Sequence, residues 1–303
     1  MPSGRYLWHR NVLYIGLAAI LVAFGIVIML LPYDTVYVQE RAYLQFFLVS
    51  IIICVWVFVI GSVYNALIWM HGRGLTGSPE GRLLRTTGKA FRFVFSKRFW
   101  KVLSVFLSEA FYLSKLKDRS YTRWLMHILI LGGFALMFLL DIIVTISMDL
   151  LQYEPMIEES GWAKMWIRDF AFDFAGLMML LGLCIAAIRR FVQRPKIIRT
   201  ELPDAVSIIF LLVVVLGGFL LEGIGIAGSI PDHEINHEYS FVGYVFSLPF
   251  PASSGDFYDQ AWLLHGIASA LLIAYIPFSK LFHMIATPIV IEAERLLPAE
   301  VSS

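Results

Sequence analysis

Long apolar blocks separated by short polar segments dominate the chain. Each block is continuously apolar and long enough to cross the roughly 30 Å of a bilayer's hydrocarbon core as an α-helix. Strands of a membrane barrel would instead alternate apolar and polar residues. The pattern predicts an all-α polytopic membrane protein whose six transmembrane helices form a bundle, at about 12–31, 43–70, 121–148, 165–190, 204–228 and 259–286.

Composition supports this interpretation, and charge adds an orientation. Hydrophobic residues make up 59% of the 303 positions and charged residues only 16%, which is little charge for a soluble domain of this size. With the N-terminus inside, the inner segments (1–11, 71–123, 186–203 and 280–303) contain 21 of the 24 Lys and Arg residues. Cytoplasmic loops carry such an excess, so we expect both termini in the cytoplasm. The net charge of +1 gives no indication of nucleic-acid binding.

The motifs that hold other redox groups or nucleotides are not present in the sequence. The two cysteines, Cys54 and Cys184, lie singly in separate spans, where a thiol behaves as a small apolar residue. No CxxCH sequence is present for covalent haem, and no cysteine cluster for an iron–sulfur centre. No Walker or GxGxxG loop is present either. Such chemistry would have to come from another subunit.

Histidines inside the spans are the first candidates for function, because an ionisable group in hydrocarbon is costly without a partner. The sixth span has His265 and His283, eighteen residues apart. In a continuous helix this is five whole turns, so both imidazoles would share a face, about 27 Å apart along the axis. Pro277 lies between them and is expected to bend the helix. The spacing predicts a helix that holds two cofactors at opposite membrane depths.

The third span supplies a partner for one of these histidines. His127 lies near the cytoplasmic end of that span, and His283 near the same end of the sixth. Two imidazoles from different helices are a common axial pair for b-type haem, which hydrophobic packing holds without covalent attachment. The alternative is that each histidine anchors a helix end by bonding a backbone carbonyl or a lipid headgroup.

Three segments resemble a known family: YIPFSKLFHMIATPIV at 275–290, LLHG at 263–266 and RWLMHILILGGF at 123–134. They are similar to the haem-bearing helices of the respiratory nitrate reductase gamma subunit. They are at least as similar to its relatives in heterodisulfide-reductase-like and dissimilatory sulfite reduction complexes. The resemblance implies a membrane cytochrome b of the bacterial or archaeal cytoplasmic membrane. Such proteins exchange electrons between a menaquinone-type quinone and a cytoplasmic iron–sulfur subunit.

The resemblance also divides the chain and assigns ligands. The haem-binding core would be 121–290, preceded by an additional helix with its outer loop (1–42), a second helix (43–70) and a basic segment (71–120), and followed by a tail (291–303). His127 and His283 match the pair that binds the inner haem, and His265 matches a ligand of the outer haem. The residue expected opposite His265 is a histidine in the family, but it is Met137 in this sequence. A His265–Met137 haem, a five-coordinate iron and loss of the outer haem are all compatible with this change, so one or two haems are expected.

Carboxylates in the outer third of the spans indicate where a quinol would react. Asp141, Asp173 and Glu222 lie at this depth, near His265. Quinol oxidation needs a proton acceptor beside the ring and a route outward, and carboxylates supply both. The alternative is that they pair with nearby cations or helix ends, as Asp169 is expected to do with Arg168.

The segment 71–120 is basic and aromatic but too interrupted by charge to span a membrane. It is typical of an amphipathic helix on the inner leaflet, and it also suits a docking platform for the iron–sulfur subunit. A transporter or proton-conducting protein without haem is the competing hypothesis for the whole chain, although paired broken helices are not evident. Another diheme reductase family is a further alternative, but it would need four histidines at paired depths.

Overall fold

The structure, a computed structural model, describes residues 4–30, 41–69, 78–94, 112, 114–157, 161–193, 202–230 and 238–283. Every regular element within these ranges is helical. Six helical segments are long and apolar enough to cross a membrane: Trp8–Ile28, Ala42–Trp69, Tyr121–Met148, Lys164–Gln193, Leu202–Ala227 and Ala252–Phe278. The predicted all-α membrane fold with six spans is therefore confirmed.

The chain divides into two compact units, of which the first contains residues 1–30, 52–110 and 273–303. It includes α1 (Gly4–Leu30), the second part of α2 (Arg41–Trp69) and α3 (Pro79–Val94). The indole N–H of Trp56 on α2 donates to the Leu21 carbonyl of α1 at 3.0 Å. The N-terminal turn of α3 packs against α1, because a β-carbon at Gly81 would lie 2.7 Å from His9 Nδ1.

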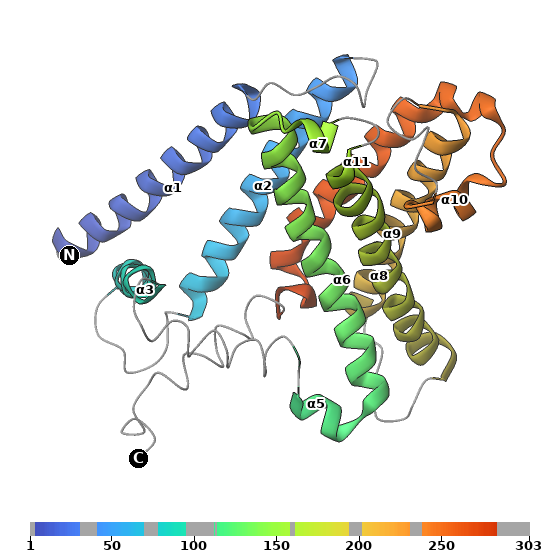
Figure 1. Cartoon of the computed structure of the whole chain (residues 1–303). Helices are drawn as coiled ribbons and strands as arrows, with labels where there is room; N and C mark the ends of the chain where they lie inside the picture. Colours follow the sequence, from blue (N-terminus) through green and yellow to red (C-terminus); the bar gives the residue numbers. More distant parts are fainter. Residues whose placement is uncertain are drawn as a thin grey trace. The chain divides into compact units, whose positions relative to one another are not determined.

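The second unit, residues 31–51 and 111–272, contains the other spans. Its helices are α5 (Ser114–Arg119), α6 (Tyr121–Thr145), α7 (Glu154–Ile157), α8 (Ala171–Ala187), α9 (Leu202–Ala227), α10 (Phe241–Ser247) and α11 (Tyr258–Tyr275, up to residue 272). Within this unit α8 packs against both α6 and α9, and α10 packs on α9 (Figure 1). Glycines allow the close approach: a β-carbon at Gly133 of α6 would lie 2.7 Å from the Ala175 carbonyl of α8.

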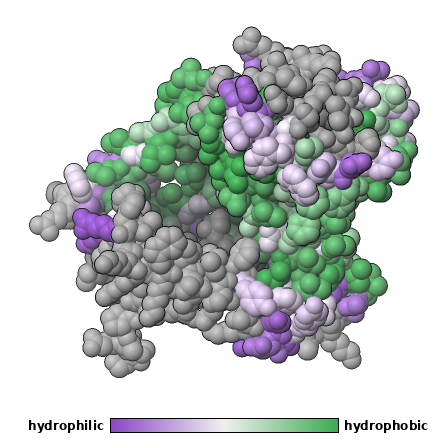
Figure 2. Space-filling view, viewed as in Figure 1, coloured by the Kyte–Doolittle hydropathy of each residue, from purple (hydrophilic) through white to green (hydrophobic). Residues whose placement is uncertain are grey.

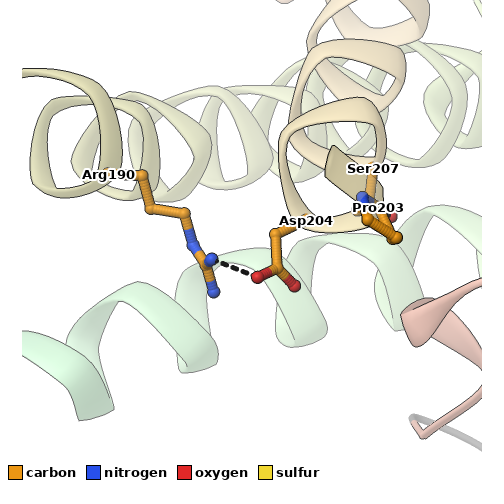
Figure 3. Close-up of polar contacts among 4 residues, drawn as sticks. All are labelled: Arg190, Pro203, Asp204 and Ser207. Atoms are coloured by element: carbon orange, nitrogen blue, oxygen red, sulfur yellow. Dashed lines mark hydrogen bonds and ion pairs between the residues drawn. The ribbon is translucent and has the colours of Figure 1, made fainter. Parts of the chain in front are cut away.

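An ion pair links the C-terminal end of the α8 segment with the start of α9. α8 continues into a π-helix, Ile188–Gln193, from which Arg190 Nη1 donates to Asp204 Oδ2 at 2.6 Å in the first turn of α9 (Figure 3). One turn on, the Ser207 hydroxyl donates to the Pro203 carbonyl at 2.8 Å. Both contacts lie at the end of the α8–α9 hairpin that is predicted to be cytoplasmic, far along both helices from Asp173 and Glu222.

Large apolar side chains are exposed along the middle of the spans, as lipid contact requires. Those of the second unit include Phe138, Leu139 and Ile142 of α6 and Phe174 and Leu181 of α8. Figure 2 shows apolar residues over the middle of this unit's helices and hydrophilic residues at the end where α5 lies. At that end the Lys117 ammonium donates to the Tyr112 hydroxyl at 2.9 Å, and this bond raises the pKa of Lys117.

The sixth span is interrupted, whereas the sequence predicts only a bend at Pro277. α11 ends at Tyr275, and two 3₁₀ turns follow, Ile276–Phe278 and Lys280–Phe282. Ser279 between them is extended, with φ −122° and ψ 171°. Pro277 causes the break. In a continuous α-helix its ring would clash with the carbonyl four residues earlier, and it has no N–H to donate to that carbonyl. The predicted five-turn phase relation between His265 and His283 is therefore wrong.

Hydrogen bonds stabilise this interruption. Asn65 Nδ2 of α2 donates to the Pro277 carbonyl at 2.7 Å, and the Ser279 hydroxyl accepts from the Leu281 N–H at 3.1 Å. These bonds satisfy polar groups that a continuous helix would have paired internally, a requirement inside a membrane.

Candidate functional site

Two carboxyl groups meet where α8 begins and α9 ends. Asp173 of α8 is only 2% exposed, and its carboxyl is hydrogen bonded to that of Glu222 of α9. A carboxylate can only accept hydrogen bonds, so two carboxyl groups that bond to each other share a proton. Asp173 Oδ1 is buried, and no other N–H or O–H group in the described part of the chain bonds to it. A proton shared with Glu222 would supply the donor that this oxygen requires.

The short helix α10 completes this carboxyl pair. The backbone N–H groups of Val242 and Gly243 both point at Asp173 Oδ2, with N–O distances of 2.6 and 3.4 Å. The hydroxyl of Ser240, the residue before α10, bonds to Glu222. Gly243 lies directly against the Glu222 side chain, where a β-carbon would overlap the carboxyl group. Three elements thus hold one pair of acids.

A π-helix, Lys164–Phe170, leads into α8 beside the pair. Asp169 lies close enough to Glu222 for its charge to act on that carboxyl. The predicted pairing of Asp169 with Arg168 is confirmed, with 3.9 Å between Oδ1 and Nε. Aromatic rings pack the same region: the ring centroids of Trp166 and Tyr239 are 5.3 Å apart, and those of Phe170 and Phe241 are 5.8 Å apart. π-Helical turns occur often at functional sites, and this one positions Asp169 next to the carboxyl pair.

His265 lies on α11 and faces two glycines of α9. A β-carbon at Gly217 would lie 3.2 Å from His265 Nδ1, and one at Gly218 would lie 3.4 Å from Cε1. The nearest neighbour at both positions is therefore the imidazole of His265. Gly218 and Glu222 are four residues apart and share a face of α9, one turn from each other. The histidine and the carboxyl pair thus occupy adjacent turns of that face.

The resemblance implies haem, and the histidines fit this group. His265 Nδ1 is buried and has no hydrogen-bond partner among the described residues, which a coordinated iron or a water would satisfy. His127 of α6 has Nδ1 2.9 Å from the Arg123 carbonyl, and His283 Nδ1 bonds to the Lys280 carbonyl. A carbonyl only accepts, so each Nδ1 carries the proton and the lone pair is on Nε2. That tautomer is typical of metal-binding histidine, and the same two bonds are also those of the alternative, in which each histidine anchors a helix end.

Two predicted residues do not join the carboxyl pair. Asp141 is exposed on α6, and no described hydrogen bond or ion pair connects it with Asp173 or Glu222. Met137 is half-buried one turn earlier on α6, and its pairing with His265 stays a prediction. No group of three metal-binding side chains occurs in the described ranges; a haem iron needs only one or two protein ligands.

Sequence reasoning missed Ser240, Gly243 and the backbone N–H groups of α10. No helix is predicted in the segment between the last two spans. A signal was present, because a serine directly before the apolar run FVGYVF is typical of a helix start. No local pattern indicates that this helix contacts Asp173, a residue 69 positions away from Val242.

Comparison with known proteins confirms the resemblance. Residues 156–295 match the family model described as nitrate reductase gamma subunit. The match includes Asp173, Glu222, His265 and His283, and begins after the helix that carries His127. No solved structure matches the chain significantly.

Curated relatives extend the similarity over most of the chain. A dihydromethanophenazine:CoB–CoM heterodisulfide reductase subunit of Methanosarcina mazei is 26% identical over 267 residues, covering 80% of this chain and 90% of the relative. The corresponding protein of Methanosarcina thermophila is 28% identical over 274 residues, covering 84% and 92%. EtfAB:quinone oxidoreductase of Syntrophomonas wolfei is 26% identical over 126 residues, covering 38% of this chain and 18% of that protein.

Proposed function

We propose that this membrane protein, whose residues 156–295 match the nitrate reductase gamma subunit family model, is the cytochrome b subunit of a quinone-linked electron-transfer complex. Its relatives' names include a dihydromethanophenazine-dependent reductase subunit and a quinone oxidoreductase. Both names describe exchange of electrons with a small redox carrier. The substrate class proposed for this chain is accordingly a membrane quinol, such as a menaquinol.

The observation that carries the proposal is the buried carboxyl pair. Its Glu222 lies one turn of α9 from the glycines that face His265. Oxidation of a quinol to a quinone releases two protons and two electrons. The carboxyls accept the protons, since they are the buried acids held in hydrogen-bonding contact. Asp141 of α6, which is more exposed than Asp173, is a third candidate for carrying protons to the outer side.

The histidines are proposed to hold b-type haem, which supplies a one-electron relay when bound. His127 and His283 are assigned to the inner haem, because each lies near the predicted cytoplasmic end of its own span. His265, with Met137 as its candidate partner, is assigned to the outer haem. The bond from each Nδ1 to a backbone carbonyl fixes the ring orientation of His127 and His283.

The electrons are proposed to pass to a cytoplasmic iron–sulfur subunit of the heterodisulfide-reductase type. Two of the relatives are themselves named as parts of such a reductase. The basic segment 71–120, of which α3 and α5 are described, is the candidate docking surface on the inner leaflet. This assignment requires the predicted topology with both termini in the cytoplasm.

Spectra of the purified full-length protein test the proposal. A reduced-minus-oxidised difference spectrum should show a haem α-band, and a menaquinol analogue should produce the reduced spectrum. We expect Glu222→Gln and Asp173→Asn to slow quinol-driven reduction while dithionite still reduces all the haem. A protein without an α-band would favour the transporter or proton-conducting alternative. Normal quinol-driven reduction in both variants would remove the carboxyl pair from the mechanism.

A further inference from the structure

The two members of the carboxyl pair have unequal surroundings. Asp173 Oδ2 accepts two backbone N–H groups, from Val242 and Gly243. Glu222 accepts one hydroxyl, from Ser240, and also faces the charge of Asp169. Backbone N–H donors stabilise a carboxylate over its neutral acid, whereas a neighbouring carboxylate disfavours a second negative charge. Both differences favour the negative charge on Asp173 and the proton on Glu222.

Two cations, Lys164 and Arg168, lie on the π-helix that leads into α8. Arg168 is directed at Asp169, 3.9 Å away, and therefore moderates the repulsion that Asp169 exerts on Glu222. Lys164, at the start of the same π-helix, is 1% exposed and lies two turns before Asp173 along the chain. Among the described residues, Ser240 and the backbone N–H groups of Val242 and Gly243 donate hydrogen bonds to the pair.

We infer that Glu222 bears the shared proton, that Asp173 is the carboxylate, and that Ser240 is a positioning residue that holds Glu222 against Asp173. This inference deepens the proposed function and rests on it for its role in turnover. A proton leaving the quinol hydroxyl would bind to Asp173, and the proton of Glu222 would leave toward the outer side. The pair would again hold one proton. Two such transfers accompany the loss of two electrons from each quinol.

Infrared spectroscopy of the purified full-length protein, without quinol, tests the assignment. Only a protonated carboxyl group gives a C=O stretching band above the amide region, and this band shifts in D₂O. We expect such a band at neutral pH, and we expect it to shift when the protein is labelled with ¹³C-carboxyl glutamate but not with labelled aspartate. The labels require no substitution, so a folding defect does not affect this result.

Variants extend the test to individual residues. Glu222→Gln should abolish the band, whereas Glu154→Gln, at an exposed position on α7, should leave it unchanged. Ser240→Ala should move the band to higher wavenumber, because the Glu222 carbonyl loses a donor, and Ser240→Thr should restore it. Ser207→Ala is the matched control, since the Ser207 hydroxyl bonds to the Pro203 carbonyl and not to an acid.

Three results would overturn the inference: no protonated carboxyl band in the wild type, a band that follows the aspartate label, or a band unchanged by Ser240→Ala. These outcomes are separable from failure of the proposed function. A band that behaves as expected, together with normal quinol-driven reduction in Glu222→Gln, would retain the proton assignment and remove the quinol site.

Discussion

Gly243 of α10 packs so closely against Glu222 of α9 that a β-carbon at position 243 would overlap the Glu222 carboxyl. The same residue donates its N–H toward Asp173. One glycine therefore makes room for one acid and bonds to the other. Both its backbone N–H and its lack of a β-carbon therefore contribute to the candidate proton site.

Gly243→Ala is expected to impair quinol oxidation without removing haem. The new methyl group must displace Glu222, because the backbone of α10 is itself held by Asp173. Overpacking of this kind costs on the order of 1–3 kcal/mol, so the thermal unfolding temperature should also fall. Stopped-flow reduction of haem by a quinol analogue measures the first effect. Gly16→Ala is the control, because nothing lies within 4 Å of a β-carbon there; equal rates in both variants would contradict the prediction.

His265 and Gly217 are predicted to act together in binding haem. A β-carbon at position 217 would already lie 3.2 Å from His265 Nδ1, so the larger Gly217→Val side chain should displace the imidazole. We expect this variant and His265→Ala to lose the same haem, leaving the one assigned to His127. The pyridine haemochrome assay gives the haem-to-protein ratio, and Gly88→Val at an open position on α3 is the control. Full haem content in both test variants would show that His265 binds none.

Hydropathy predicts the spans and places Asp173 and Glu222 at one depth, because the bilayer fixes the length of a helix and the cost of charge inside it. It does not predict the interruption at Ser279. That break is stabilised by Asn65, more than two hundred residues away, which donates to the backbone carbonyl of Pro277. A periodic count through Pro277 therefore gives a wrong phase for His283.

The carboxyl pair, too, could be predicted from the sequence only in part. Its two acids were recognisable individually, because each is an ionisable residue in an apolar segment. The backbone donors to Asp173 depend on the return of α10 to the start of α8, which a single sequence does not encode in any local pattern. Two glycines of α9 also differ in what they contact, which their sequence does not reveal: Gly223 packs against the Phe246 backbone, whereas Gly217 faces the imidazole of His265.

The ion pair between Arg190 and Asp204 is predicted to stabilise the protein without taking part in electron transfer. Its side chains are 28% and 9% exposed, so its contribution should lie between those of surface and buried pairs, about 1–3 kcal/mol. Arg190→Met should lower the unfolding temperature and leave quinol-driven reduction of the remaining folded protein unchanged. Arg189→Met, which retains the pair, is the control. An equal loss of stability in both variants would indicate a general need for positive charge at this end.

Neighbouring glycines on α6 should respond differently to the same methyl group. At Gly133 a β-carbon would lie 2.7 Å from the Ala175 carbonyl and 2.9 Å from the Met179 N, both backbone atoms of α8. At Gly132 the nearest atom is the terminal methyl of Met178, at 3.2 Å. A methionine end can move, but a helix backbone cannot move without separating α6 from α8. Gly133→Ala should therefore cost on the order of 1–3 kcal/mol, and Gly132→Ala should be nearly neutral. Thermal unfolding of the two detergent-solubilised variants gives the comparison, and equal unfolding temperatures would show that α6 and α8 pack less closely than this.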